Sequence, residues 1–196
     1  MITKTIHELV QEAVETGKWI LRRSNAGEAY GGFRWSPIGE WTEAPDWNPS
    51  PECGGGLHGN GPESTGYWTD GSDVDFCTYD GEVVDIEGEK VKVRRAMVLL
   101  RNELPDGLHV GGSLYLRGTG ITQLPDGLHV GGSLDLENTG ITQLPDGLHV
   151  GGSLDLRGTG ITQLPDGLHV GGSLYLRGTG ITQLPDGVTV EEEVIY

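Results

Sequence analysis

The stretch "LPDGLHVGGSLYLRGTGITQ" at residues 104–123 decides the fold of the C-terminal half. It recurs with a period of 20 residues from Leu124, Leu144 and Leu164, and a shorter copy, "LPDGVTVEEEVIY", begins at Leu184. Self-similarity at a fixed period is typical of a solenoid, in which each coil stacks on the one before it. The frequent glycines oppose a helix, and the apolar alternation has the period of a strand. The repeat therefore predicts coils that contain two short strands each.

The same alternation predicts which side chains face the interior of each coil. In the first coil this inward set is Leu104, Leu108, Val110, Leu114, Leu116 and Ile121. Stacking at about 4.8 Å per coil would bury the set and its equivalents as continuous apolar columns. A threonine recurs at one bend of each coil, at Thr119, Thr139, Thr159 and Thr179. We expect its hydroxyl to bond backbone groups of the next coil.

Two outward columns carry nearly all the variation among the four full copies. One column consists of Tyr115, Asp135, Asp155 and Tyr175, and its neighbour consists of Arg117, Glu137, Arg157 and Arg177. Successive residues of a strand point to opposite faces, so both columns lie outside if the leucines lie inside. Tyr and Arg are common hot-spot residues, which favours a binding surface. The alternative is that recently duplicated coils have drifted only at these solvated positions, where nothing constrains the residue.

The segment "SLYLRGTGITQLPDGL" resembles the "LxLxxNxLxxLP" frame of leucine-rich repeats, in the short class of 20 residues found in bacterial effector proteins. The resemblance covers residues 104 to about 190 and implies that the outward strand face is the ligand surface. The chain departs from that family in having Thr in place of Asn and "GLHVGG" in place of a proline-rich segment. A straighter, two-sheeted β-solenoid is therefore the alternative to a horseshoe.

A histidine column formed by His109, His129, His149 and His169 should point outward from the other strand. Imidazoles stacked about 4.8 Å apart could change charge near pH 6 or take a metal ion. Parallel side chains rarely converge on one ion, so we predict a solvated ladder and assign no metal and no cofactor.

Residues 1–103 are predicted to form a small α+β domain that caps one end of the solenoid of residues 104–196. The segment "TIHELVQEAVETG" at 5–17 has a one-faced apolar pattern and a natural stop at Gly17, which predicts a helix. Strands are predicted in "KWILRRS", "GEVVDIEG" and "EKVKVRRAMVLL". Residues 35–81, rich in Gly, Pro, Trp and acidic residues, are predicted to form long ordered loops around this sheet.

The motif "PECGGGLHG" at 51–59, with the strand pair that follows it, resembles small Cys-Gly-x-Gly-Leu-His domains of tailed-phage and bacterial proteins. The resemblance covers roughly residues 30–100 and implies a phage or mobile-element origin more than a particular chemistry. Cys53 and His58 could form a thiolate–imidazole pair oriented by Asp75 or Asp46. Glycine-loop spacing does not fix that geometry, and a zinc site with Cys77 lacks a ligand spacing signature.

Composition restricts the classes of partner. The formal net charge of −16 disfavours nucleic acid as a direct partner. No apolar run approaches the roughly 18 residues of a membrane span, and the first residues lack the apolar core of a signal peptide. We therefore expect a cytoplasmic protein, in the host cytoplasm if phage-encoded, whose two cysteines stay reduced.

Together these patterns predict a protein-binding protein, specifically a phage or mobile-element accessory or anti-defence factor that blocks a host protein. An enzyme with its site at Cys53, His58 and Asp75, targeted by the solenoid, is one alternative. A sponge for a nucleotide-like small molecule is another. That sponge would use the arginine column or the tryptophans of the acidic window, which are Trp35, Trp41, Trp47 and Trp68.

Overall fold

The structure, a computed structural model, describes residues 4–29, 32–67 and 70–196, and the chain divides into two compact units, residues 1–101 and 102–196. The first unit starts with helix α1 (Ile6–Thr16), where the sequence predicts it. Thr5 and Glu8 form a reciprocal capping box at its start, and Gly17 ends it in the left-handed conformation with φ 67°. In the described part of the chain, no helix has the length and apolarity that crossing a membrane requires.

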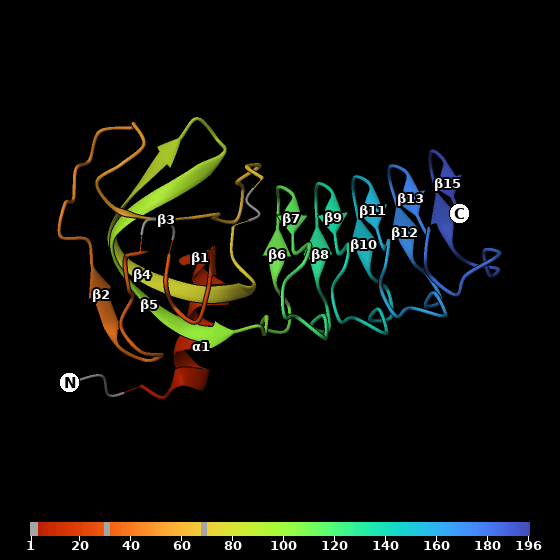
Figure 1. Cartoon of the computed structure of the whole chain (residues 1–196), viewed down its shortest axis with the longest axis horizontal. Coiled ribbons are helices and arrows are strands. Elements are labelled where there is room, and N and C mark those ends of the chain that lie inside the picture. The colour runs from red at the N-terminus through yellow and green to blue at the C-terminus, as the bar shows by residue number, and fades with distance from the viewer. Residues whose placement is uncertain (1–3, 30–31, 68–69) are drawn as a thin grey trace. The chain divides into compact units, whose positions relative to one another are not determined.

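An antiparallel sheet forms the body of the first unit (Figure 1). Its strands are β1 (Trp19–Ser24), β2 (Trp41–Glu43), β3 (Leu57–Gly59), β4 (Asp73–Ile86) and β5 (Lys90–Arg101). The order is β1-β4-β5-β2, and β3 pairs with another part of β5. Buried side chains such as Ile20, Val93 and Val98 form its core. Among the described residues of this unit, the regular structure consists of one helix and one antiparallel sheet.

The prediction that residues 35–81 form loops is wrong in three places. Strands β2 and β3 lie within that range, and β4 begins at Asp73 rather than near Gly81. The start of β4 reads "DVDFCTY", in which two acidic residues alternate with apolar ones. Asp75 is nonetheless fully buried, because arginines of β1 and β5 surround its carboxylate.

The second unit is a β-solenoid built from two parallel five-stranded sheets. One sheet contains β6 (His109–Val110), β8 (His129–Val130), β10 (His149–Val150), β12 (His169–Val170) and β14 (Thr189–Val190). The other contains β7 (Leu114–Tyr115), β9 (Leu134–Asp135), β11 (Leu154–Asp155), β13 (Leu174–Tyr175) and β15 (Val194–Ile195). Each coil contributes one strand to each sheet, as Figure 1 shows for this unit. This is the two-sheeted arrangement that the sequence left open.

The interior of the solenoid is the predicted one. All six inward residues of the first coil are buried, with Leu108, Leu116 and Ile121 fully so. Strands pair in exact repeat register, for example Leu134 with Leu154 and Val130 with Val150. Identical side chains therefore stack on identical ones in the four full coils, which explains why the apolar positions do not vary among these coils.

The predicted threonine ladder between coils is wrong. The hydroxyl of Thr119 donates to the carbonyl of Leu116, three residues back in its own coil, at 2.6 Å, and its equivalents do the same. Serines make the bond between coils instead. The Ser133 N–H donates to Oγ of Ser113 at 3.0 Å, and the pattern repeats at Ser153 and Ser173. The threonine hydroxyl bonds within its own coil because the Leu116 carbonyl at the same bend is within its reach as an acceptor.

Candidate functional site

The predicted recognition residues of the solenoid lie together on one face, which we call the variable face. It comprises Tyr115, Arg117, Asp135, Glu137, Asp155, Arg157, Tyr175 and Arg177. Backbone pairing places Tyr115 beside Asp135, Asp135 beside Asp155, and Asp155 beside Tyr175. These four side chains are half-buried, whereas Arg117 and Arg177 are exposed. The structure thus assembles both predicted columns into one continuous surface.

Ion pairs connect the variable face across three coils. Glu137 Oε2 forms ion pairs with Arg117 Nη1 of the first coil, 2.9 Å away, and with Arg157 Nη2 of the third, 2.8 Å away. The Arg157 guanidinium also binds the Asp155 carboxylate, and it lies 5.5 Å from the ring centroid of Tyr175. Arg157 therefore holds two acids and one aromatic ring in a fixed arrangement.

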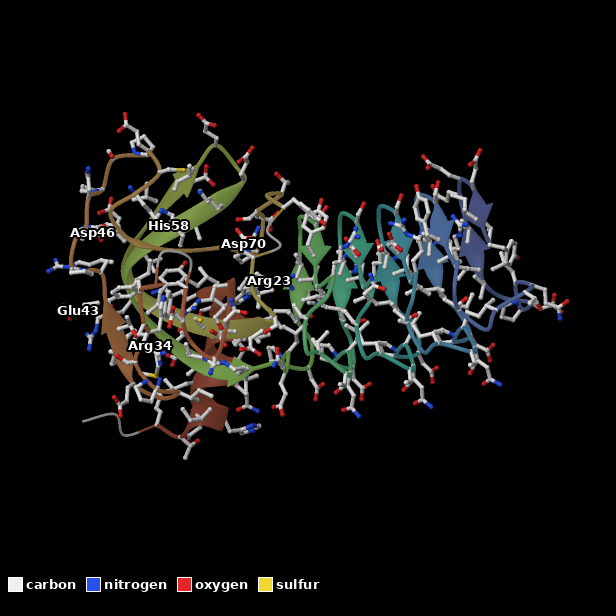
Figure 2. The ribbon with its side chains drawn as sticks, viewed as in Figure 1. Arg23, Arg34, Glu43, Asp46, His58 and Asp70 are labelled. Atoms are coloured by element: carbon white, nitrogen blue, oxygen red, sulfur yellow. The ribbon has the colours of Figure 1, made fainter. Side chains whose placement is uncertain are left out.

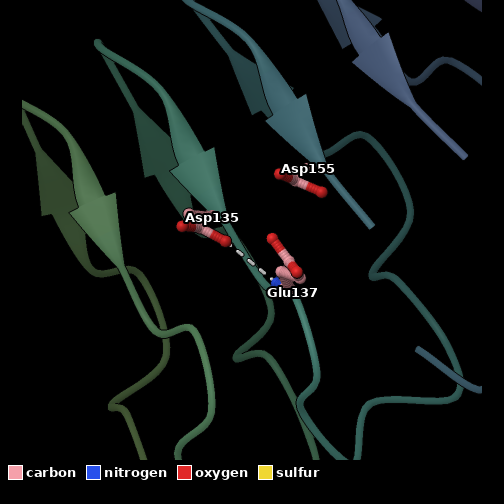
Figure 3. A group of neighbouring side chains, drawn as sticks. All are labelled: Asp135, Glu137 and Asp155. Carbon is pink, nitrogen blue, oxygen red and sulfur yellow. Dashed lines mark hydrogen bonds between the residues drawn. The ribbon is translucent and has the colours of Figure 1, made fainter. Parts of the chain in front are cut away.

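Asp135, Glu137 and Asp155 offer carboxylate oxygens that lie within 4.8 Å of one another (Figure 3). Two arginines already bind this group, as described above, and the Glu137 N–H donates to Asp135 Oδ1 at 2.9 Å. Burial, as the main cause, raises the pKa of the Asp135 carboxyl above its usual range. The cluster is an internally compensated part of the variable face, and it carries no argument for a bound metal.

On the other sheet, the histidine column forms a stacked ladder. Ring centroids are 5.3 Å apart between His109 and His129, 4.7 Å between His129 and His149, and 4.8 Å between His149 and His169. Glu191 in the fifth coil lies 3.6 Å from His169. The last three rings are nearly parallel, with interplanar angles of 5° and 4°, and the first is tilted by 25°. Stacked rings of this kind do not direct their nitrogens to a single point.

Acidification is expected to destabilise the solenoid through this ladder. Burial, followed by the nearby His149 and His109, lowers the pKa of His129 below that of a free histidine. The folded state then binds fewer protons than the unfolded chain, so the free energy of unfolding falls as the pH drops from about 7 to about 5. Each adjacent pair of imidazolium ions adds about 1 kcal/mol of repulsion in a water-like dielectric.

Amide hydrogen exchange in peptides from residues 102–196, at both pH values, measures this loss. The His129→Gln variant interrupts the ladder at its second member and should show a flatter pH dependence. A variant as pH-sensitive as the original chain would contradict the ladder as the cause.

The first unit contains a cavity of about 570 Å³, which we call the arginine cavity. Its lining includes Arg22 and Arg23 of β1, Trp35, His58 of β3, Tyr67 and Lys90. In Figure 2 the labelled Arg23, Asp46, His58 and Asp70 come from four different segments of this unit, and all four line the cavity. Sequence reasoning singled out His58 and Trp35 but missed the arginines. The signal was "WILRRS", two adjacent arginines within a strand that is buried throughout.

The "CGGG" motif forms a packed loop on the wall of this cavity. The fully buried Lys92 donates its Nζ to the carbonyl oxygens of Glu52 and Gly54, both at 2.9 Å. Gly55 has a φ of +58°, and a Cβ there would lie 2.7 Å from the carbonyl oxygen of Asp46. A residue with a side chain would push the loop away from its neighbour, so the glycine has a structural role.

The structure brings Cys53, His58 and Asp46 to the arginine cavity but places Asp75 and Cys77 elsewhere. Ser24 donates to Asp75 Oδ2 at 2.9 Å, and Arg101 Nε donates to Oδ1 at 2.6 Å. Cys53 is exposed, whereas Cys77 is fully buried, and burial strongly raises the pKa of its thiol. Neither Asp75 nor Cys77 is among the described residues that line the cavity. The catalytic trio with Asp75 and the zinc set with Cys77 are therefore not assembled there, whereas the alternative acid Asp46 does line the cavity with Cys53 and His58.

The tryptophans of the acidic window occupy different surroundings. Trp35 is buried beneath the Arg22 guanidinium, 4.0 Å from its ring centroid, and Trp41 lies under Arg95 at 4.4 Å. Trp47 packs against the core of the first unit. Trp68 lies outside the described residues.

No family model, curated protein or solved structure matches this chain. The resemblances to leucine-rich repeats and to phage Cys-Gly-x-Gly-Leu-His domains therefore stay predictions.

Proposed function

We propose that this chain is a binding protein and that the variable face is its recognition surface for another protein. One observation carries the proposal: nearly all of the variation among the four full coils lies on a single face, where side chains hold one another in place. Arg157 donates to Asp155, forms an ion pair with Glu137 and lies beside Tyr175, so little rotamer freedom remains to be lost when a partner binds. Tyr and Arg in such a setting are the residue types that dominate binding energies.

The partner we propose is a protein of the host cell, which the chain would block as an accessory or anti-defence factor. The basis for this choice is the resemblance of roughly residues 30–100 to phage and bacterial domains. The net charge of −16 disfavours nucleic acid and favours a protein with a basic surface. Tyr115 and Tyr175 would contact its apolar atoms, and its cations would compete with Arg117 and Arg157 for the acids of this face.

Changing Tyr115, Asp135, Asp155 and Tyr175 together to serine should abolish retention of the partner in a pull-down from host lysate. Losing a tyrosine hot spot costs about 2 kcal/mol or more, so the combined loss exceeds 100-fold in affinity. The matched control changes His109, His129, His149 and His169 to serine on the opposite sheet, and it should retain the partner. Equal retention by both variants, or capture of nothing by the unmodified chain, would contradict the proposal.

A further inference from the structure

We propose a second binding site, on the first unit: the arginine cavity takes a small anion that carries a planar ring, a ligand of the nucleotide class. The strongest observation is Arg22. Its side chain is 2% exposed, it lines the cavity, and its Nη1 and Nη2 have no hydrogen-bond partner among the described residues. Buried guanidinium nitrogens without acceptors are costly, and an entering anion would supply the missing acceptors.

The negative charge near Arg22 is already shared with other donors, so a further anion would find a cation there that is only partly compensated. The nearest acid, Asp75, lies 3.7 Å from Nη1 of Arg22, but its two oxygens already accept bonds from Ser24 and Arg101. One carboxylate is thus shared between two guanidinium groups. Arg23 and Lys90 add further cationic groups to the lining.

The charged residues of the lining differ in their exposure to solvent. Arg22 and Arg23 are buried, whereas the acids of the lining, Asp46 and Asp70, are exposed. An anionic group would therefore bind deep in the cavity, and the acids would face the hydroxyl or amine groups of the same ligand nearer the solvent. This gradient of charge selects a molecule with a phosphate at one end and neutral donors at the other.

The remaining lining accounts for a ring. Phe33 is half-buried and Tyr67 is half-exposed at the cavity, and both can stack on a flat heterocycle. His58 Nε2 is buried, finds no hydrogen-bond partner in the part of the chain that the structure describes, and can bond a ring nitrogen or a hydroxyl. The volume of about 570 Å³ is within the range of cavities that bind cofactor-sized molecules.

Cys53 makes the test direct, because it lies on the lining and is exposed, while Cys77 is buried and serves as an internal control. Adenosine monophosphate at about 1 mM should slow alkylation of Cys53 in the full chain at least severalfold, and calorimetry should detect its binding.

Adenosine and inorganic phosphate, each alone, should protect at least tenfold less well. Absence of both protection and binding heat with the nucleotide would overturn the proposal. Equal protection by adenosine would refute the anion site, and equal protection by phosphate would refute the ring site.

Variants locate the site. Arg22→Gln should weaken nucleotide binding at least tenfold, whereas Arg34→Gln should not, since Arg34 pairs with Glu28 at the surface and is 76% exposed. Should Arg22→Gln fail to fold, Ala29→Leu narrows the cavity without removing a charge and should also weaken binding. Unchanged affinity in a folded Arg22→Gln or Ala29→Leu chain would place the nucleotide elsewhere and overturn the proposal. Because the variable face belongs to the other unit, these results bear on this cavity alone.

Discussion

Gly151→Ala is expected to destabilise the solenoid by about 3 kcal/mol or more, near the top of the range for overpacking. A Cβ at this position would lie 3.0 Å from the carbonyl carbon of Gly131 and would overlap its oxygen. That carbonyl belongs to the preceding coil, and the Gly151 N–H is itself bonded to the Val130 oxygen at 2.8 Å. The coils can make room only by separating, which weakens both sheets at this point.

The fifth coil has glutamates at both glycine positions of this corner. In the column of Gly151 itself, the backbone N–H to O distance is 2.8 Å at Gly151, 2.9 Å at Gly171 and 3.0 Å at Glu191. Backbone N–H to O distances along the next glycine column are 2.8 Å for Gly152 to Gly132 and 3.0 Å for Gly172 to Gly152. Where the repeat has Glu192 instead of glycine, the bond to Gly172 lengthens to 3.4 Å. A side chain at the glycine corner therefore coincides with a wider step between coils.

The matched control is Gly147→Ala in the same coil. Gly147 has a φ of +67° but no atom within 4 Å of a Cβ, so alanine there suffers only the left-handed backbone penalty of about 1–2 kcal/mol. Hydrogen exchange in peptides from residues 124–183 compares the two variants. The steric account predicts that Gly151→Ala costs at least 1 kcal/mol more than Gly147→Ala, and equal costs would refute it.

The solenoid was largely predictable because its contacts are set by one repeat. Pairing at a spacing of 20 residues follows once the period is known, and strand alternation then assigns inside and outside to Leu114, Tyr115 and Leu116. The direction of single hydroxyl bonds was not predictable in this way. Thr119 and Ser113 both carry a hydroxyl at a bend, but Thr119 donates within its own coil while Ser113 accepts from the next coil, and only the backbone geometry decides this.

The first unit was less predictable because its contacts join distant segments. Asp75 reads as a surface acid from its neighbours in sequence, and only β1 and β5 together supply the arginines that allow its burial. The arginine cavity has the same origin, since its lining combines β1, β3 and several loops. No periodic pattern marks such a site, although two arginines in a strand with no exposed position were an available sign.

Asp75→Asn is expected to destabilise the first unit by about 3–5 kcal/mol, the usual cost of removing one partner of a buried ion pair. The substitution keeps the shape of the side chain but removes the charge that Arg22 and Arg101 share. Arg22 would then be a buried cation without a counterion, and its stacking on Trp35 would not replace the lost attraction. All five tryptophans lie between Trp19 and Trp68, so their fluorescence in a urea titration follows this unit alone.

Asp80→Asn, on the same strand, is the control for the loss of an acid. Asp80 pairs with Arg95 at 3.1 Å, but 49% of its side chain is exposed, so its removal should cost less than about 1 kcal/mol.

A similarly small loss for Asp75→Asn would show that Arg22 remains stable in the cavity without a counterion. The buried cation would then exert little demand for an acceptor, and the case for an anion beside it would weaken. A large loss that added nucleotide reverses would instead show the ligand supplying the missing negative charge, because a molecule that binds only the folded state raises its stability.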